Sequence, residues 1–210
     1  MGKTLKNTWA LFTGIGIILL ANGLQGNLMG VRSVIENFSA LSTGIMMSGY
    51  FVGYFVGSNL TPNMVSRVGH IRVFAAFASL ASLSILIIAT YVNPIVWTLG
   101  RFLTGLSLVS CYVVAESWLN DRANNRTRGK LLSIYMIINY LALGSGALLL
   151  NFDDPTSFKP FILVSILLSI ALVPILLTKR PAPKFKKIGT LNLIELYKIS
   201  PLGTVSSFCT

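Results

Sequence analysis

Long apolar runs alternate with short polar stretches along the whole chain. The apolar runs cover about residues 8–30, 40–61, 71–92, 95–118, 129–151 and 159–178. Each run has roughly the 20 residues that a helix needs to cross a bilayer. Because lipid offers the backbone no hydrogen-bond partner, such runs form either helices or the strands of a closed barrel. Residues 161–178 (FILVSILLSIALVPILLT) lack the alternation of a barrel strand, so the pattern predicts an all-α membrane protein with six spanning helices.

A seventh apolar run begins near Pro201 and stops at Thr210, after roughly half the length of a bilayer-spanning helix. It follows a basic stretch with a Pro-Ala-Pro step, in which either a short interfacial helix or an ordered loop fits the spacing of the apolar residues. We therefore expect a six-helix bundle over 1–178, a basic linker over 179–200 and the start of a seventh helix over 201–210. This division indicates a fragment of a longer protein.

Composition and charge agree with a membrane protein. Only 11% of the residues are charged and 53% are hydrophobic, whereas a soluble domain carries about 25% charged residues. The net charge of +11 comes from basic residues that lie before the first run or after the second, fourth and sixth. These residues are Lys3, Lys6, Arg67, Arg72, Arg122, Arg126, Arg128, Lys130, Lys179, Arg180, Lys184, Lys186, Lys187 and Lys198. By the positive-inside rule they predict a multi-pass protein of the inner membrane with a cytoplasmic N-terminus, bound to lipid and not to nucleic acid.

The sequence offers little material for an enzyme or a metal site. His70 is the only histidine, and Cys111 and Cys209 do not have the spacing of metal ligands. A membrane enzyme would need acidic, histidine or cysteine residues clustered at one depth, and the sequence shows no such cluster. We therefore predict no enzymatic activity, no cofactor and no metal.

Small and polar residues inside the apolar runs predict how the helices pack. Gly49, Gly53 and Gly57 form a stripe on one helix face, which lets a neighbouring helix approach closely, and Gly105 is a fourth candidate for such packing. Polar residues concentrate in the first and fourth runs. These two runs occupy equivalent places in a division into three plus three helices and cross the membrane in opposite directions, as an inverted repeat requires.

Several short motifs carry a family resemblance. They are ANGLQG (21–26), RVGHIRVF (67–74), RFLTG (101–105), VAESWLNDRA (114–123) and RGKLLS (128–133). In order, spacing and side of the membrane they resemble the YcaD-like branch of the major facilitator superfamily. Three departures stand out. Ser66 occupies the place of a motif aspartate, which weakens the transfer of its locking role to this chain. His70 and Ile71 occupy the places of two basic residues, with Arg72 one place late, and the fifth run lacks the Gly-Pro step typical of drug–proton antiporters.

The resemblance covers the whole chain and implies the N-terminal six-helix half of a major facilitator fold, with two inverted three-helix repeats and the start of the second half. It implies a proton-coupled secondary transporter that moves a small-molecule substrate by alternating access, with the missing C-terminal half as partner. The polar residues fit anions, sugars, amino acids or drugs almost equally well. The alternative is a non-transporting six-helix receptor or assembly factor, although the loops are short for such a role.

The resemblance also implies a gate at the cytoplasmic ends of the helices. Glu116 lies near the end of the fourth run, and Arg67, Gly69, Arg72 and Arg128 lie in the neighbouring loops. Like elements in the family form a charge relay that opens and closes the inner gate. The other two interpretations of Glu116 are a proton carrier and a solvated carboxylate.

The candidate substrate-binding residues are polar groups at membrane depth: Asn22, Gln25, Arg101, Tyr112 and Asn139. Arg101 is too costly for a lipid face, so it either contacts substrate in a wet cavity or serves a structural pair or the outer headgroups. It lies fifteen residues from Glu116, roughly 22 Å along a helix, so the two cannot pair. Asn22 and Gln25 share one helix face and can bind a polar solute or hold two helices together.

Overall fold

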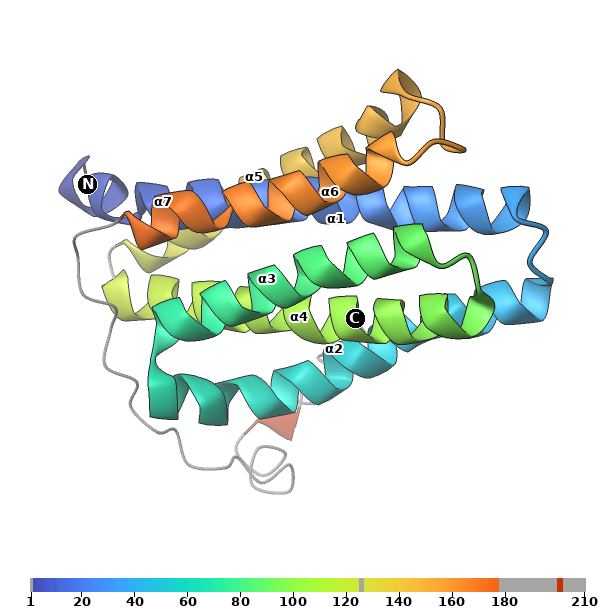
Figure 1. The fold of residues 1–210 in the computed structure, drawn as a ribbon. Helices are drawn as coiled ribbons and strands as arrows, with labels where there is room; N and C mark the ends of the chain where they lie inside the picture. Colours follow the sequence, from blue (N-terminus) through green and yellow to red (C-terminus); the bar gives the residue numbers. More distant parts are fainter. Residues whose placement is uncertain (1, 125–126, 178–199, 202–210) are drawn as a thin grey trace.

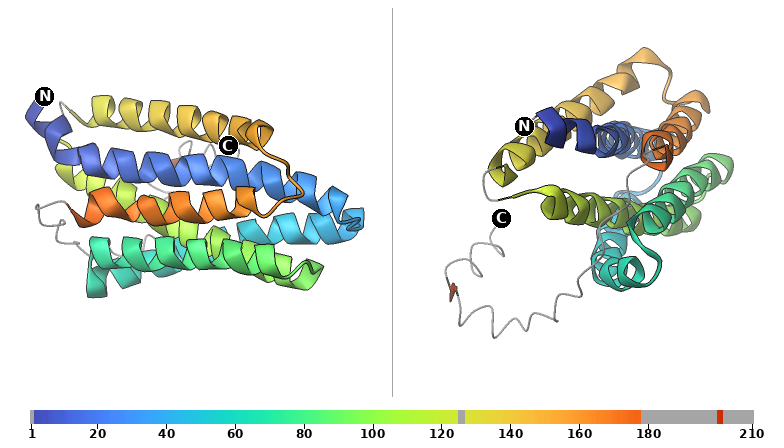
Figure 2. Two further views of the ribbon diagram at one scale, coloured as in Figure 1. Left: turned by 45° about the horizontal axis from the view of Figure 1, so that its top comes forward. Right: turned by 90° about the vertical axis from the view of Figure 1, so that its left-hand side faces the viewer.

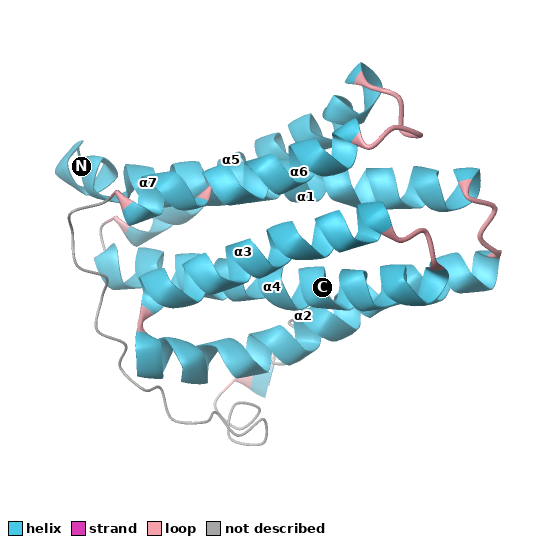
Figure 3. Ribbon diagram, in the orientation of Figure 1, coloured by secondary structure: helices cyan, strands magenta, loops and turns pink. Residues whose placement is uncertain are grey.

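The computed structural model describes residues 2–124, 127–177 and 200–201, with side chains from Thr8 onward (Figures 1 and 3). Helices are the regular secondary structure throughout these residues. The elements are α1 (Gly2–Ile35), α2 (Ala40–Val68), α3 (His70–Thr90), α4 (Pro94–Arg122), α5 (Arg128–Leu149), the 3₁₀ turn η1 (Leu150–Phe152), α6 (Lys159–Ile170) and α7 (Leu172–Leu176). The predicted linker 179–200 and seventh helix 201–210 fall almost entirely outside the described residues.

The helices follow the predicted apolar runs. Five stretches are long and apolar enough to span a bilayer: Thr8–Ile35, His70–Thr90, Pro94–Arg122, Arg128–Phe152 and Lys159–Leu176. The second predicted run, α2, is not among these five. It has 29 residues, but its glycines, serines and tyrosines lower its mean hydropathy. The sixth run is divided into α6 and α7, because Pro174 has no N–H to donate to the carbonyl of Ile170, where α6 ends. The prediction of an all-α membrane fold is confirmed.

Short local signals mark several helix ends. Ser39 caps α2, where its hydroxyl accepts the N–H of Ser42 at 3.1 Å. Asn93 caps α4 by accepting the N–H of Ile95 at 2.8 Å, and Pro94 is the first residue of that helix. Gly69 alone connects α2 to α3, with φ at 88°, a conformation that glycine adopts without strain.

The helices form a series in which each packs on the next: α2, α4, α3, α6, α1 and α5 (Figure 2). α1 also touches α4 near the centre. Exchanging α1 with α4, α2 with α5 and α3 with α6 turns this series into its own reverse. α1 and α4 run in opposite directions (Figure 1), so the two inverted three-helix repeats predicted from the sequence are present. We call the side between α2 and α5, with α1 and α4 as its floor, the open face.

Reciprocal glycine contacts hold α2 against α4. A methyl group on Gly53 would overlap the carbonyl oxygen of Phe102, and a methyl group on Gly105 would overlap the carbonyl oxygen of Tyr50. Each carbonyl belongs to the residue three positions before the partner glycine. The two backbones therefore meet without an intervening side chain, a geometry that supports Cα–H···O contacts and dispersion in lipid.

The same contact recurs between α1 and α5. A methyl group on Gly23 would overlap the carbonyl of Leu143, and one on Gly146 would overlap the carbonyl of Leu20. Again each carbonyl lies three residues before the partner glycine. Because α1 and α5 correspond to α4 and α2 in the repeat, the same packing geometry occurs twice, once between α2 and α4 and once between α1 and α5.

The remaining predicted packing glycines also lie against α4. A methyl group on Gly49 would lie 3.0 Å from the carbonyl oxygen of Thr98, and one on Gly57 would lie 2.6 Å from that of Leu106. The glycine stripe of α2 thus contacts more than two turns of α4.

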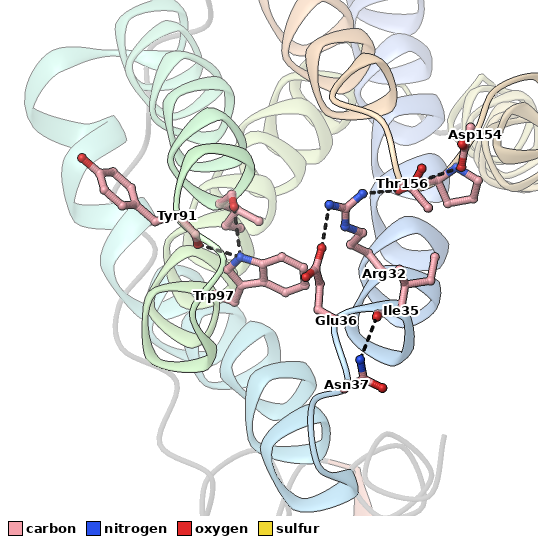
Figure 4. Close-up of polar contacts among 10 residues, drawn as sticks. Arg32, Ile35, Glu36, Asn37, Tyr91, Trp97, Asp154 and Thr156 are labelled. Atoms are coloured by element: carbon pink, nitrogen blue, oxygen red, sulfur yellow. Dashed lines mark hydrogen bonds and ion pairs between the residues drawn. The ribbon is translucent and has the colours of Figure 1, made fainter.

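Polar contacts fasten the loops at one end of the bundle, which we call the Arg32 end (Figure 4). Arg32 pairs through Nη2 with Glu36 at 2.6 Å and donates through Nη1 to the Pro155 carbonyl at 2.9 Å, which joins the α1–α2 loop to the loop before α6. In that loop the Asp154 carboxylate accepts the Thr156 N–H at 2.8 Å, and this hydrogen bond lowers the pKa of Asp154 below its ordinary value.

Trp97 fastens the third loop of the Arg32 end. Its indole Nε1 donates to the carbonyls of Ile88 at 3.0 Å and Tyr91 at 2.9 Å, at the end of α3 (Figure 4). Its ring lies 4.9 Å from that of Phe38, in the loop before α2. The opposite end, where His70 begins α3, we call the His70 end; the predicted topology puts it in the cytoplasm.

Replacing Gly53 with alanine should weaken the α2–α4 contact, because the new methyl group overlaps the Phe102 carbonyl. We expect the free energy of unfolding to fall by about 1–3 kcal/mol, the usual cost of overpacking. Unfolding in detergent, followed by tryptophan fluorescence, measures the change. Gly44→Ala is the matched control, since a methyl group on that residue of the same helix meets no atom within 4 Å. Equal stability of the two variants would contradict the close approach.

Candidate functional site

Polar side chains from four helices converge over the floor of the open face. We call them the central polar cluster: Asn22 and Gln25 of α1, Tyr50 and Tyr54 of α2, Arg101, Thr104, Tyr112 and Glu116 of α4, and Tyr135 and Asn139 of α5. Helical spacing of three or four residues places most of them in pairs on one face of each helix. All five predicted substrate-binding residues belong to this cluster.

Arg101 is the most unusual member of the cluster. It lies in the first third of α4 and only 5% of its surface is exposed. Its guanidinium carbon lies 4.5 Å from the centre of the Tyr50 ring, close enough for a cation–π interaction. Its Nε and Nη1 atoms are buried and have no hydrogen-bond partner among the described residues. Arg101 therefore points into the protein, where two of its donors have no partner among the described residues.

Gln25 joins the two helices of the floor. Its side chain is fully buried, and its Nε2 donates to the Thr104 hydroxyl at 3.3 Å; that hydroxyl in turn donates to the Gly100 carbonyl at 2.7 Å. The Gln25 Oε1 atom is buried without a partner among the described residues. One half of the amide thus ties α1 to α4, while the other half remains an unused acceptor.

Tyrosines surround these groups from three helices. Tyr50 and Tyr54 have ring centres 6.2 Å apart on α2, and Tyr112 has both of them and Tyr135 as electrostatic neighbours. Asn22 reaches the Tyr50 hydroxyl, while the Tyr112 hydroxyl is buried without a partner among the described residues. The cluster can therefore offer a solute aromatic faces together with donors and acceptors.

Glu116 lies toward the other end of α4 and is exposed. It accepts a hydrogen bond from the Tyr135 hydroxyl at 3.2 Å. Arg67, Arg72 and Arg128 are also exposed and lie at the His70 end, in the last turn of α2 and the first turns of α3 and α5. None of the three pairs with Glu116 in the described part of the chain, so the charge relay stays a prediction.

The sequence interpretation left Tyr50, Tyr54, Thr104 and Tyr135 out of the site. A signal was present for the first two: each follows a packing glycine, Gly49 and Gly53, by one position, so both flank the glycine stripe. Tyr135 precedes Asn139 by four residues, the spacing of neighbours on a helix face.

An apolar groove of about 650 Å³ lies elsewhere on α2 and α4, toward the Arg32 end. Its lining consists of Ala40, Leu41, Gly44, Ile45, Ser48, Gly49, Val52, Thr98, Leu99 and Phe102. The lining carries no charge and contains no member of the central polar cluster, so the groove is not the site of polar recognition. Across the described residues no three His, Cys, Asp or Glu side chains gather as metal ligands do.

Comparison with known proteins relates this arrangement to transporters. The family description "Major Facilitator Superfamily" matches residues 10–207. The uncharacterized MFS-type transporter YcaD of Escherichia fergusonii is 25% identical over 189 residues, which cover 90% of this chain and 50% of that protein. An uncharacterized MFS-type transporter of Enterobacter sp. (strain 638) is 27% identical over 171 residues, 80% of this chain and 44% of that protein. The chain spans about half the length of these curated relatives.

A cysteine at Tyr54 should react with a water-soluble maleimide, because that position faces the open face and the reagent attacks a thiolate, which forms only in contact with water. Leu83→Cys is the matched control: it lies in the middle of α3 behind the floor and is more exposed, at 54% against 39% for Tyr54. Both changes are made with Cys111 and Cys209 replaced by serine. Labelling is followed in membrane vesicles by gel shift, and equal labelling of the two positions would contradict a wet open face.

Proposed function

The chain belongs to the Major Facilitator Superfamily, and on this basis we propose that the protein is a secondary active transporter of the inner membrane. The described helices would form one half, and the rest of the protein would close the open face. A small solute would bind near the midplane between the halves and be exposed to each side in turn. The basic residues near the His70 end support a cytoplasmic N-terminus.

The observation that carries this proposal is a group of buried polar atoms midway along α1 and α4 that have no partner among the described residues. They are Gln25 Oε1, Arg101 Nε and Nη1, and Tyr112 Oη. Leaving one such atom unsatisfied in a protein interior costs about 1–3 kcal/mol. A protein that only needed to pack six helices would gain stability from apolar residues at these positions. A solute or water that visits the open face would satisfy them.

The packing supports movement of the bundle as one body. Backbone contacts lock α2 to α4 and α1 to α5, so the helices within each pair keep their spacing, and the Gln25–Thr104 hydrogen bond joins the two pairs. Alternating access would then require the whole half to rock against its partner rather than its helices to separate. The tied loops at the Arg32 end would move together with it.

We further propose that Glu116 couples transport to protons. It and Asp121 are the carboxylates within the described helices, and Glu116 is the deeper of the two. It accepts a hydrogen bond from Tyr135 at 3.2 Å and has no ion-pair partner among the described residues. Intramembrane carboxylates commonly serve as proton relays in transporters.

Transport is tested in proteoliposomes with the protein expressed at the full length that its gene encodes. A panel of labelled solutes chosen from the metabolites that accumulate in a knockout strain is offered with and without a pH gradient. Gradient-driven uptake of at least one solute is expected. Absence of flux for every solute would instead favour the receptor or assembly role.

The Glu116→Gln variant should lose accumulation driven by the pH gradient and keep exchange of labelled for unlabelled solute, because exchange needs binding and reorientation but no net proton movement. Asp121→Asn, which removes an exposed carboxylate at the end of the same helix, should behave as the wild type. Uptake and counterflow assays in the same vesicles separate the two activities. Gradient-driven accumulation by Glu116→Gln would rule out proton coupling at this residue.

A further inference from the structure

We propose that the solute is a small organic anion whose carboxylate binds Arg101, an inference that rests on the proposed transport function. Arg101 is 95% covered and its Nε and Nη1 donors have no partner among the described residues. Most buried arginines are held by a carboxylate or by carbonyl oxygens.

No described carboxylate offsets the Arg101 charge. Glu116 lies fifteen residues further along the same helix, roughly 22 Å away. Glu36 is already paired with Arg32 at 2.6 Å. The other described carboxylates lie at the end of α4 or in the loop before α6: Asp121, Asp153 and Asp154. Since an unpaired buried charge costs several kcal/mol, Arg101 favours an anion from solution and disfavours a cation.

The geometry of the guanidinium selects an oxyanion. The Tyr50 ring covers one face of the group at 4.5 Å, so the edges of its plane, where the N–H bonds point, remain for a ligand. Carboxylates accept such N–H groups in charge-assisted hydrogen bonds, often two at a time. Because the Tyr50 ring covers the Arg101 guanidinium so closely, Tyr50 or its neighbours must shift to admit the solute.

Gln25 adds a second requirement. Its Nε2 is bonded to Thr104, three residues or about 4.5 Å of helix rise beyond Arg101, so its unused Oε1 lies beside the next turn of α4. A buried oxygen acceptor favours a solute with an O–H or N–H group. A hydroxy- or amino-carboxylate satisfies both Arg101 and Gln25, whereas a simple fatty acid satisfies Arg101 alone.

Binding is measured on the purified full-length protein by the shift of its thermal unfolding in detergent, independently of transport. The anionic probes are lactate, malate and glutamate; propionate lacks the second donor, glucose is neutral and choline is cationic. Stabilisation by at least one of the three hydroxy- or amino-carboxylates is expected, with weaker effects of propionate and none of glucose or choline. Vesicles of phosphatidylglycerol test whether a lipid phosphate takes the site instead.

Arg101→Gln should raise the apparent Kd for the anion by at least about thirty-fold, as expected for truncating one partner of a buried charged contact. Arg101→Lys keeps the charge but loses the planar donors, so an intermediate loss is expected, and this variant also serves if Arg101→Gln fails to fold. Lys159→Gln, which removes an exposed cation, should bind as the wild type does.

The outcomes separate this inference from the transport proposal. Flux of neutral or cationic solutes without Arg101-dependent anion binding would overturn the inference and leave transport intact. Arg101-dependent anion binding without any flux would support the inference and count against transport. The absence of a shift with every carboxylate would also overturn the inference and would point to a counter-charge supplied by the rest of the protein. A shift with phosphatidylglycerol alone would overturn it as well.

Discussion

The fold depends on the close approach of helix backbones in a solvent that gives helices no hydrophobic reason to associate. In lipid, helices hold together through dispersion, weak hydrogen bonds and shape. The reciprocal pairs Gly53–Gly105 and Gly23–Gly146 supply this contact twice, each with the partner carbonyl at the same offset. The first pair fixes α2 against α4 and the second fixes α1 against α5, the four helices that contribute to the central polar cluster.

This spacing explains how the bundle tolerates its polar centre. Side chains displaced from the glycine contacts turn toward the open face, where Tyr50 lies over Arg101 and Gln25 reaches Thr104. On the other side of the floor, α3 meets α6 through hydrogen-bonded serines, with Ser82 Oγ and Ser165 Oγ 2.7 Å apart. These serines at the back are satisfied, whereas Arg101, Gln25 and Tyr112 at the front each keep a buried polar atom without a partner among the described residues.

Much of the fold could be predicted from the sequence because lipid imposes strong constraints: the lengths of the apolar runs specify the helices, and the order of the motifs specifies the superfamily, both now confirmed. The break at Ala171 and the helices that Gly23 and Gly146 contact were not predicted. They depend on which neighbour each helix meets and in what register, information that no single helix contains. Tyr135 was missed for the same reason, because its role follows from its hydrogen bond to Glu116 on another helix.

The placement of charge along α4 has an electrical consequence. The helix begins at the Arg32 end, so its aligned peptide dipoles make that end positive and the His70 end negative. Arg122 in the last turn offsets the negative end in the usual way, whereas within the helix Arg101 stands in the first third and Glu116 near the last turns. Both side chains add to the dipole instead of offsetting it. Between Arg101 and Glu116, α4 therefore carries a separation of charge along its axis, with the positive side toward the Arg32 end.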